Sequence, residues 1–363
     1  MAENPKIWHY DHPLQLEKGG ELPALQLAYQ TWGEFNEARD NVLLVVHALT
    51  GNTDVSEWWG PLLGPGKSLD TENYFVICIN NLGSPYGSTS PLTFKKKGLD
   101  PTTFPEITIR DIVRSQKLLL DHLGVKKLQS VLGGSLGGMV SLEWPLLYPD
   151  VVDTFVTIGS TAKHSAWCIG ISDLQRDAIM SDPAWNNGNY ETQPVNGLSL
   201  ARKIAMVSYR SSQSFEQRFG RELKDEQNTY FQVESYLDYQ GKKLVKRFDA
   251  NCYIEMTKIM DTHNIGRGRN SHIQALKRLH QPGLVLSIDS DILYPPEDQR
   301  EIFSNLPNGQ WYQIKSVHGH DGFLIESEQV EEALNNFAAK CWSGDRPESC
   351  GLQHKYEECI EVP

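Results

Sequence analysis

The sequence predicts an α/β fold in which helices flank a mostly parallel central sheet. Short, almost continuously apolar runs at residues 41–49 and 74–80 are typical of strands that are covered on both faces. Further strand-like runs alternate with stretches of helical periodicity, which favours right-handed βαβ units. This alternation stops after residue 160 and resumes at about residue 280. The interruption indicates a segment inserted into the α/β fold.

The alternation can be followed through the first half of the chain. Residues 107–124 predict an amphipathic helix that packs on the sheet. Gln116 is the one polar residue in its helically spaced row, whose apolar members are Ile109, Ile112, Val113, Leu119, Leu120 and Leu123. We predict strands at 128–133 and 152–159, with a helix at 138–147 between them.

After residue 160 the pattern changes to aromatic, amide-rich and charged stretches. Residues 198–209 and 214–223 are the clearest helices of this part. Strand-like segments return at 283–289 and 310–317, and a helix is predicted over 326–341. The tail after residue 342 is expected to be loosely ordered.

This order predicts one domain with an insertion. Residues 1–160 and 280–363 are expected to form the α/β core, and residues 161–279 a helical lid domain inserted in it.

Composition and charge limit the function. The chain is 39% hydrophobic and 22% charged, as in a soluble globular protein, and its net charge of −12 argues against binding to nucleic acid. No apolar run resembles a signal peptide or a membrane span, so we expect a cytoplasmic protein. The six cysteines are scattered without a CxxC pair, which predicts reduced thiols and no metal site.

A nucleophile motif stands at residues 133–137. Gly133-Gly134-Ser135-Leu136-Gly137 matches the G-x-S-x-G pattern, with a predicted strand before it and a predicted helix after it. In that context the serine occupies a sharp, strained turn at a helix N-terminus, where backbone N–H groups favour a developing negative charge. The motif predicts the α/β-hydrolase fold with Ser135 as nucleophile.

A serine nucleophile needs a base, and the base needs an acid to orient it. In this fold the chain order is Ser, then Asp or Glu, then His. Asp291 follows the strand-like residues 283–289 and is preferred to Asp289, which would still lie at the end of that strand. The histidine that follows the last strand is His320 or its rival His318.

The second part of an oxyanion hole is expected after an early strand. Residues 47–51 (HALTG) follow an apolar run directly, so we assign the oxyanion donors to the backbone N–H groups of Leu49 and Leu136. His47 is expected to hold this loop in shape.

With these motifs the chain resembles the homoserine O-acetyltransferase family of methionine biosynthesis over about residues 27–326. HALTGNTDVSEWWGPLLGPGKSLDTENYFVICINNLGSPYGSTSP is similar to the opening block of the family and GGSLGGMVSLEW to its nucleophile block. SIDSDILYPPED and GHDGFLIE are similar to its acid and histidine blocks. The resemblance implies a triad of Ser135, Asp291 and His320.

The resemblance also implies residues that hold the acceptor. Members of the family use an arginine and a tyrosine of the lid and the aspartate beside the catalytic histidine. Here these are Arg202, Tyr209 and Asp321, with Arg202 for the acceptor carboxylate and Asp321 for its ammonium group. Arg210 and Arg218 are left open between a structural role and binding of the CoA phosphates.

The function implied is acetyl-CoA:L-homoserine O-acetyltransferase, with ping-pong transfer through an acetyl group on Ser135. Acetyl-CoA enters as a co-substrate, no bound cofactor is expected, and a homodimer formed through lid helices is implied. A succinyltransferase, a serine acyltransferase and a plain esterase remain as alternatives on the same fold. The neutral residues 58–66 favour an acetyl over a succinyl group.

Overall fold

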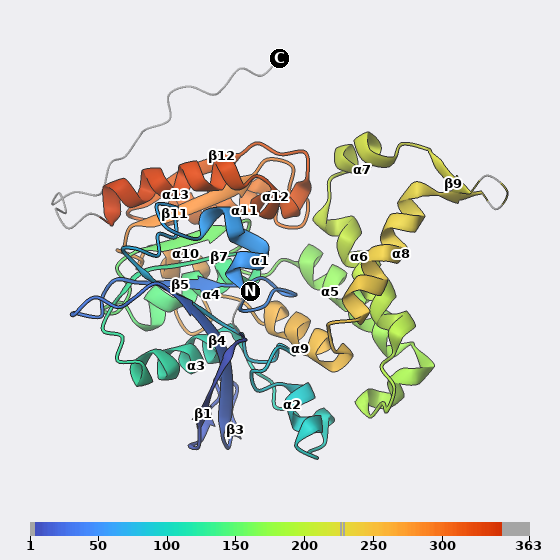
Figure 1. Ribbon diagram of the computed structural model, residues 1–363, viewed down its shortest axis with the longest axis horizontal. Coiled ribbons are helices and arrows are strands. Elements are labelled where there is room, and N and C mark those ends of the chain that lie inside the picture. Colours follow the sequence, from blue (N-terminus) through green and yellow to red (C-terminus); the bar gives the residue numbers. More distant parts are fainter. Residues whose placement is uncertain (1–3, 226, 228, 343–363) are drawn as a thin grey trace.

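The computed structural model describes residues 4–225, 227 and 229–342. Its centre is an eight-stranded sheet in the order β1-β4-β6-β5-β7-β8-β11-β12, with helices on both faces (Figure 1). The strands are β1 (Lys6–Tyr10), β4 (Leu25–Trp32), β5 (Val42–Val46), β6 (Phe75–Ile79), β7 (Leu128–Gly134), β8 (Phe155–Ile158), β11 (Gly283–Ile288) and β12 (Gly309–Ile314). From β6 to β12 all neighbouring strands are parallel. The predicted fold class is confirmed.

The first two strands of the sheet are antiparallel and were not predicted. β1 pairs with β4, and β4 pairs with β6, both antiparallel. β1 is largely exposed, so its sequence lacks the apolar run that identifies the inner strands. Two further small sheets join β2 (Leu14–Gln15) to β3 (Glu21–Leu22) and β9 (Leu223–Asp225) to β10 (Tyr230–Phe231).

The inner strands are buried because helices cover both faces of the sheet. In β5 every residue is buried: Val42, Leu44 and Val46 join one hydrophobic cluster, while Leu43 and Val45 join another. The helices of the core are α1 (Val55–Trp59), α2 (Pro91–Lys96), α3 (Ile109–His122), α4 (Leu136–Leu147), α10 (His272–Leu276), α11 (Pro296–Asn305), α12 (Gly322–Ile325) and α13 (Ser327–Cys341). Single 3₁₀ turns occur at η1 (Gly60–Leu62), η2 (Pro101–Thr103), η3 (Pro183–Gly188) and η4 (Gly319–Asp321).

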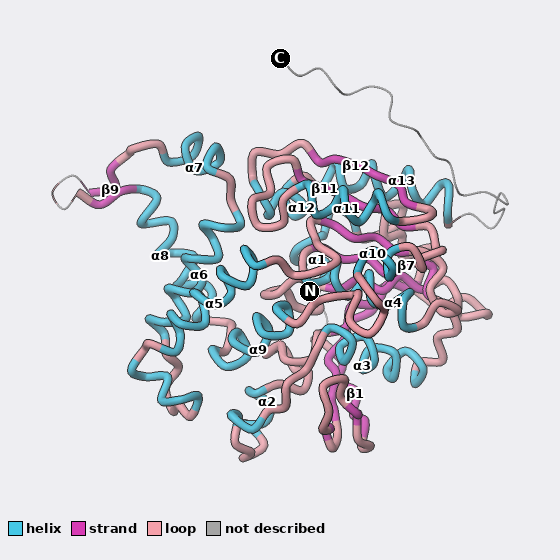
Figure 2. Tube along the Cα trace, turned by 180° about the vertical axis from the view of Figure 1, so that it is seen from behind, coloured by secondary structure: helices cyan, strands magenta, loops and turns pink. Residues whose placement is uncertain are grey.

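The segment between β8 and β11 is mainly helical and projects from one side of the sheet (Figures 1 and 2). We call α5 (Ala166–Met180), α6 (Val195–Tyr209), α7 (Ser212–Phe219), α8 (Gln232–Val245) and α9 (Ala250–Asp261) the lid helices. α6 packs between α5 and α8. The helix predicted at 214–223 is too long, because Gly220 (φ 47°) ends α7 and β9 begins at Leu223. The predicted domain limits at residues 160 and 280 stay a prediction.

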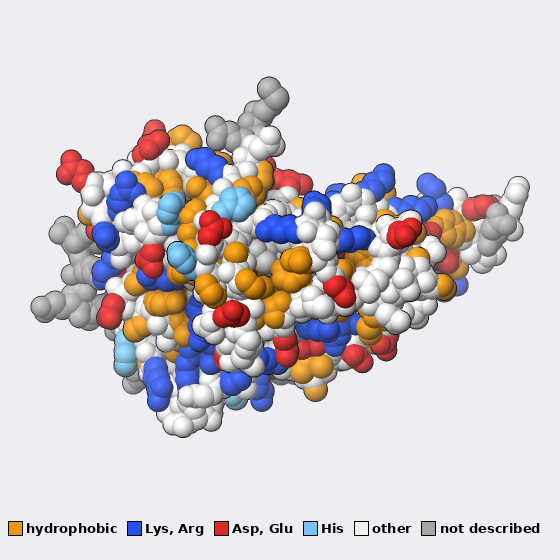
Figure 3. Space-filling view, turned by 90° about the horizontal axis from the view of Figure 1, so that it is seen from below, with side chains coloured by type: hydrophobic (Ala, Val, Ile, Leu, Met, Phe, Trp, Pro, Cys, Tyr) orange, Lys and Arg blue, Asp and Glu red, His pale blue; other side chains and the backbone are white. Residues whose placement is uncertain are grey.

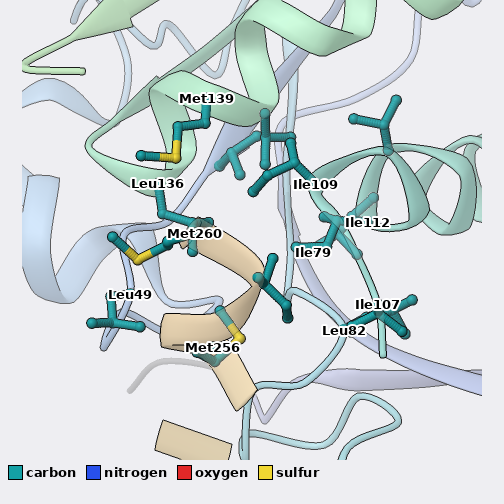
Figure 4. Packing of buried hydrophobic residues seen from close by; sticks show 14 of the residues in the cluster. Leu49, Ile79, Leu82, Ile107, Ile109, Ile112, Leu136, Met139, Met256 and Met260 are labelled. Atoms are coloured by element: carbon teal, nitrogen blue, oxygen red, sulfur yellow. The ribbon is translucent and has the colours of Figure 1, made fainter. Parts of the chain in front are cut away.

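α9 joins the lid helices to the core. Met256 and Met260 of this helix lie in the same hydrophobic cluster as Ile79 and Leu136, as Figure 4 shows. This cluster fills the space beneath the lid helices with apolar side chains from the sheet, α3, α4 and α9. The lid helices are therefore anchored through the main core.

The chain leaves for the lid helices and returns from them along a two-stranded ribbon. Lys163 and Asn264 form an antiparallel bridge. Beside it, the His164 N–H donates to the His263 carbonyl at 3.0 Å, and the Ile265 N–H donates to the Ala162 carbonyl at 3.1 Å. The outgoing and returning segments are thus held next to each other at the edge of the core.

The surface carries charges of both signs, and the described thiols are buried. The face in Figure 3 carries acidic and basic side chains close to one another. Among the described residues, no helix combines the length and apolar character needed to cross a bilayer. Cys78, Cys168 and Cys252 are buried free thiols, in agreement with the prediction of reduced cysteines. The predicted loose tail lies outside the described residues.

A buried ion network fastens the returning segment to the core. Glu143 of α4 pairs with Arg110 of α3 at 3.1 Å and with Arg269 at 2.8 Å, while Glu17 pairs with Arg110 and Arg267. The Glu143 side chain is only 2% exposed. A carboxylate this deeply buried is tolerated because two guanidinium groups surround it.

Replacement of Glu143 by Ala is expected to destabilise the fold strongly. It leaves the partly buried guanidinium of Arg269 without its carboxylate and takes from Arg110 one of its two, which costs about 3–5 kcal/mol. Urea unfolding followed by circular dichroism measures this loss. Asp121→Ala, which breaks an exposed i,i+4 pair with Lys117, serves as the control and should cost less than about 1 kcal/mol. Equal losses in the two variants would contradict the buried network's role.

Candidate active site

Ser135 lies in a strained turn between β7 and α4. Its φ of 58° and ψ of −122° fall in a region that non-glycine residues rarely occupy. Two hydrogen bonds hold it there: its N–H donates to the Ile158 carbonyl at 2.9 Å, and its carbonyl accepts from Ser160 Oγ at 2.8 Å. The strain and its anchors are those expected of a nucleophile elbow.

Glycines on both sides make this turn possible. A Cβ on Gly137 would lie 2.2 Å from the Val46 carbonyl oxygen, and a Cβ on Gly133 would lie 2.6 Å from the Gly137 carbonyl carbon. Both contacts are with backbone that cannot move aside, so only glycine fits at these positions. The start of α4 is consequently pressed against the end of β5.

The Asp291 and His320 side chains form a buried pair. Asp291 Oδ2 lies 2.7 Å from His320 Nδ1. Asp291 Oδ1 accepts hydrogen bonds from the backbone N–H groups of Leu293 and Tyr294, at 2.9 and 3.0 Å. These donors fix the carboxylate in the turn after β11, so it can orient the imidazole.

The competing residues lie elsewhere. Asp289 Oδ1 accepts from the Ser316 N–H at 2.9 Å, which ties the ends of β11 and β12 together. His318 Nδ1 faces Arg210 and Ser214, at 3.4 and 3.5 Å. Of the two carboxylates and two histidines considered, the structure therefore pairs Asp291 with His320.

His320 lies beside the turn that carries Ser135. A Cβ on Gly159 would lie 3.6 Å from His320 Cε1, and Gly159 follows Ile158, whose carbonyl binds the Ser135 N–H. Although burial lowers the pKa of His320, the adjacent Asp291 carboxylate raises it above its usual value. An imidazole of raised pKa is suited to accept the proton of a hydroxyl that comes within hydrogen-bond distance.

Leu49 and Leu136 bring two backbone N–H groups to this place. Leu136 is the first residue of α4, and Leu49 lies in the loop after β5. Neither N–H donates a hydrogen bond within the described part of the chain. Their side chains point into one hydrophobic cluster with Met260 (Figure 4). Such N–H groups are suited to receive an oxyanion.

Arg202, Tyr209 and Asp321 gather beside His320. The Arg202 guanidinium lies over the Tyr209 ring, with Cζ 5.5 Å from its centroid, and the Tyr209 ring lies 5.7 Å from that of His320. Arg202 Nη1 is buried without a hydrogen-bond partner among the described residues. Burial raises the pKa of the Asp321 carboxyl, while Arg210 and Arg202 oppose that rise. Together these groups can bind a small molecule that carries one negative and one positive charge.

The two arginines left open now have distinct surroundings. Arg210 Nε forms an ion pair with Asp321 Oδ2 at 3.0 Å, a contact that sequence reasoning missed because the residues are far apart in the chain. Arg218 lies over the Phe219 and Tyr236 rings, with its Cζ 5.2 and 4.8 Å from their centroids. Arg218 therefore packs within the lid helices.

A small cavity of about 10 Å³, room for about one water, lies between the core and the lid helices. Leu49 and Tyr294 line it from the core, and Tyr209 and Gln175 from the lid helices. No lysine or arginine is among its described lining residues. Residues 58–66, whose neutrality pointed to a small acyl group, do not line it; Trp59 instead donates its indole N–H to the Phe323 carbonyl.

A resident metal would need a cluster of ligands. Within residues 4–225, 227 and 229–342, no group of three or more His, Cys, Asp and Glu side chains is arranged to hold a metal ion.

Comparisons with known proteins agree with this geometry. A family model described as the alpha/beta hydrolase fold matches residues 41–327. A homoserine O-acetyltransferase of Chloroherpeton thalassium is 50% identical over 344 residues, which cover 93% of this chain and 90% of that protein. The crystal structure of a homoserine O-acetyltransferase from Bacillus anthracis has a TM-score of 0.85 at 25% identity, covering 94% of this chain and 99% of that one. An acetylester hydrolase from Corynebacterium glutamicum shares the fold, with a TM-score of 0.82 at 24% identity and coverage of 92% and 95%.

The reactivity of Ser135 is expected to depend on pH through His320. The imidazole can accept a proton only above its pKa, which Asp291 raises above 6.5. Labelling of Ser135 by a fluorophosphonate should therefore slow as the pH falls, with a midpoint above 6.5. Asp321→Asn should lower that midpoint, since the Asp321 carboxylate also raises the pKa of His320. A midpoint at or below 6.5 in the unmodified protein would contradict this account.

Proposed function

We propose that this chain, which belongs to the alpha/beta hydrolase fold family and within it to the homoserine O-acetyltransferases, transfers an acetyl group from acetyl-CoA to the side-chain hydroxyl of L-homoserine. The observation that carries the proposal is the strained Ser135 turn beside the Asp291–His320 pair, in a chain half identical to a homoserine O-acetyltransferase over nearly its full length. The reaction makes O-acetyl-L-homoserine and belongs to methionine biosynthesis.

In the first half-reaction Ser135 becomes acetylated. His320 takes the hydroxyl proton of Ser135 while Ser135 Oγ attacks the thioester carbonyl of acetyl-CoA. The oxyanion of the tetrahedral intermediate accepts hydrogen bonds from the N–H groups of Leu49 and Leu136, each worth about 3 kcal/mol. The C–S bond then breaks, the CoA sulfur takes the proton from His320, and CoA leaves.

The second half-reaction repeats these steps with the amino acid. His320 takes the proton of the homoserine hydroxyl, whose oxygen attacks the acetyl carbonyl on Ser135. The intermediate collapses, the proton passes to Ser135 Oγ, and O-acetyl-L-homoserine leaves. Asp291 holds the His320 tautomer and stabilises the imidazolium in both halves.

The charged ends of homoserine would hold it in the correct orientation. Arg202, with its unpartnered Nη1, is suited to the carboxylate, and Asp321 to the ammonium group. The pairing of Asp321 with Arg210 favours the ionised form and so opposes the rise in pKa that burial causes. An acceptor held at both ends competes well with water for the acetyl group, because its hydroxyl has a high effective concentration.

Two further features support the transfer of a small acyl group within a closed site. The cavity beside Leu49 has no lysine or arginine among its described lining residues, so it offers no cationic partner for a succinyl carboxylate, and it has room for about one water. The core and the lid helices together enclose it. We propose that the lid helices are part of the reaction, as a cover that excludes water.

We also propose that two copies associate through the lid helices and that the protein works in the cytoplasm. Leu200 and Val207 of α6 are exposed by 49% and 52%, and being two turns apart they share one helix face. Leu174 of α5 and Tyr239 of α8 are also exposed, by 59% and 60%. Exposed apolar side chains gathered on packed helices are typical of a subunit interface.

The function is tested by thiol release with each pairing of acetyl-CoA or succinyl-CoA and L-homoserine or L-serine. We expect fast, acceptor-dependent release only with acetyl-CoA and homoserine, because the neutral site fits acetyl and the acceptor groups span homoserine. Ser135→Ala should abolish it. Preference for another pair would change the substrate assignment, and hydrolysis of simple esters without any CoA-dependent transfer would make the protein an esterase.

Arg202→Lys is expected to weaken the second half-reaction alone. Loss of the planar, bidentate donor should lower kcat/KM for homoserine about 100-fold, equivalent to about 3 kcal/mol. The rate of Ser135 acetylation by acetyl-CoA should be unchanged. Lys203→Met, which alters the next residue and its ion pair with Asp238, is the control and should leave both rates unchanged. An equal loss in acetylation and in transfer to homoserine would contradict the role of Arg202 in acceptor binding.

A further inference from the structure

His47 contacts two different partners through its two ring nitrogens. It is completely buried, directly after β5, at the start of the loop that carries Leu49. Nδ1 lies 2.8 Å from the Ala48 carbonyl oxygen, and Nε2 lies 3.1 Å from the Asn81 backbone nitrogen. A backbone N–H can only donate, so Nε2 is the acceptor and Nδ1 carries the hydrogen. Burial lowers the pKa of His47 to about 4, which keeps the ring neutral near pH 7.

This tautomer constrains the peptide unit between Ala48 and Leu49. The Ala48 carbonyl oxygen accepts one hydrogen bond from His47 Nδ1 and a second from the Gly51 N–H at 2.9 Å. In a planar trans peptide the carbonyl and the following N–H point in opposite directions. Two donors on the Ala48 oxygen therefore fix the direction of the Leu49 N–H.

A chain of buried side chains holds the main chain of His47 through its carbonyl oxygen. Asn81 Nδ2 donates to the His47 carbonyl at 3.2 Å, and Gln116 Nε2 donates to Asn81 Oδ1 at 3.3 Å. Gln116 Oε1 accepts from the indole N–H of Trp144 at 2.9 Å. All four side chains are fully buried. Trp144 belongs to α4, the helix that starts after Ser135, so the chain ties the nucleophile's helix to the loop of Leu49.

This arrangement explains Gln116, the polar residue in an otherwise apolar helical row. A buried amide is costly unless its groups are bonded, and here the amide nitrogen and oxygen each have a partner. The contacts run from α4 through α3 to the loops after β6 and β5.

We propose that His47 is a positioning residue for acyl transfer: its Nδ1–H holds the Ala48–Leu49 peptide with the Leu49 N–H directed at the oxyanion. The Asn81 backbone N–H keeps the His47 ring in place, and the Asn81, Gln116 and Trp144 side chains keep its main chain in place. The inference rests on the proposed function in one respect, that the Leu49 N–H receives the oxyanion. It gives His47 a role through a peptide unit, with no contact to substrate. The oxyanion hole is thereby formed before substrate arrives.

Two replacements of His47 separate this role from simple support of the loop. His47→Asn keeps an amide N–H near the position of Nδ1 and loses the acceptor for Asn81. His47→Gln keeps an oxygen near the position of Nε2 and loses the donor to the Ala48 carbonyl. If His47 acts through Ala48, the Asn variant should be the more active; if it only anchors Asn81, the Gln variant should be.

The measurement is the rate of Ser135 acetylation, by acetyl-CoA and separately by 4-nitrophenyl acetate. For His47→Gln we expect a loss of about 100-fold with both reagents, as for a lost oxyanion donor, and a KM for acetyl-CoA within about twofold of the unmodified protein. His47→Asn should stay within about tenfold of the unmodified rate. A Gln variant as fast as the Asn variant would overturn the proposal.

The second reagent keeps this inference separate from the proposed function. If the unmodified protein is acetylated by 4-nitrophenyl acetate but not by acetyl-CoA, the transferase assignment fails while the ranking of the two variants still decides the role of His47.

The far end of the chain gives an independent test if the histidine variants do not fold. Gln116→Met removes both links in the amide chain at nearly constant volume. Ser115→Ala is its control, because Ser115 is equally buried on α3 but its hydroxyl donates only to the Ile112 carbonyl of the same helix. We expect slower acetylation in Gln116→Met than in Ser115→Ala when both are measured well below their unfolding temperatures, since the buried groups left unpaired also lower the stability of Gln116→Met. Equal acetylation rates in the two variants would overturn the proposal.

Discussion

The close approach of α4 to the end of β5 is the constraint on which the rest of the site depends. The Val46 carbonyl lies so near Gly137 that no side chain fits between them, and this contact brings the loop after β5 next to the first turn of α4. The loop of Leu49, the turn of Ser135 and the start of the helix thereby share one small space. The backbone strain at Ser135 is tolerated because the surrounding sheet and helix are packed on all sides. The free energy of packing in the sheet thus offsets the cost of the strained Ser135 backbone.

Much of the fold could be predicted because its inner strands are covered on both faces and read as apolar runs. The strands β5, β6, β7, β8, β11 and β12 were recognised in this way, and the helices α3, α4 and α13 from their helical periodicity. The turn of Ser135 was also recognised, because its glycines and its position between a strand and a helix leave a clear signal. Chain order in a known fold favoured Asp291 over Asp289 but left His320 and His318 open, and the resemblance to the family selected His320. The antiparallel strand β1 escaped because it is largely exposed and carries mixed residues, and β4 escaped because polar residues interrupt its apolar ones.

What could not be predicted depends on contacts between residues that are distant in the chain. Nothing in the sequence near Arg210 reveals that it pairs with Asp321, more than a hundred positions away. The same holds for Glu143, which meets arginines from two separate segments, and for Gln116, whose polar side chain looked like an irregularity in a helix until its partners Asn81 and Trp144 were located. Helix ends also followed local backbone conformation, as Gly220 shows for α7.

The ribbon formed by Lys163 with Asn264 has a consequence for how such proteins diversify. Because the outgoing and returning segments lie side by side, the helices between them form an insertion whose two ends join the core at neighbouring points. Replacing this insertion by a longer or shorter one changes the entropic cost of closing the loop only slightly, and it leaves the sheet unchanged. A changed insertion can then bind a different acceptor, while Ser135, Asp291 and His320 keep their places at the edge of the sheet.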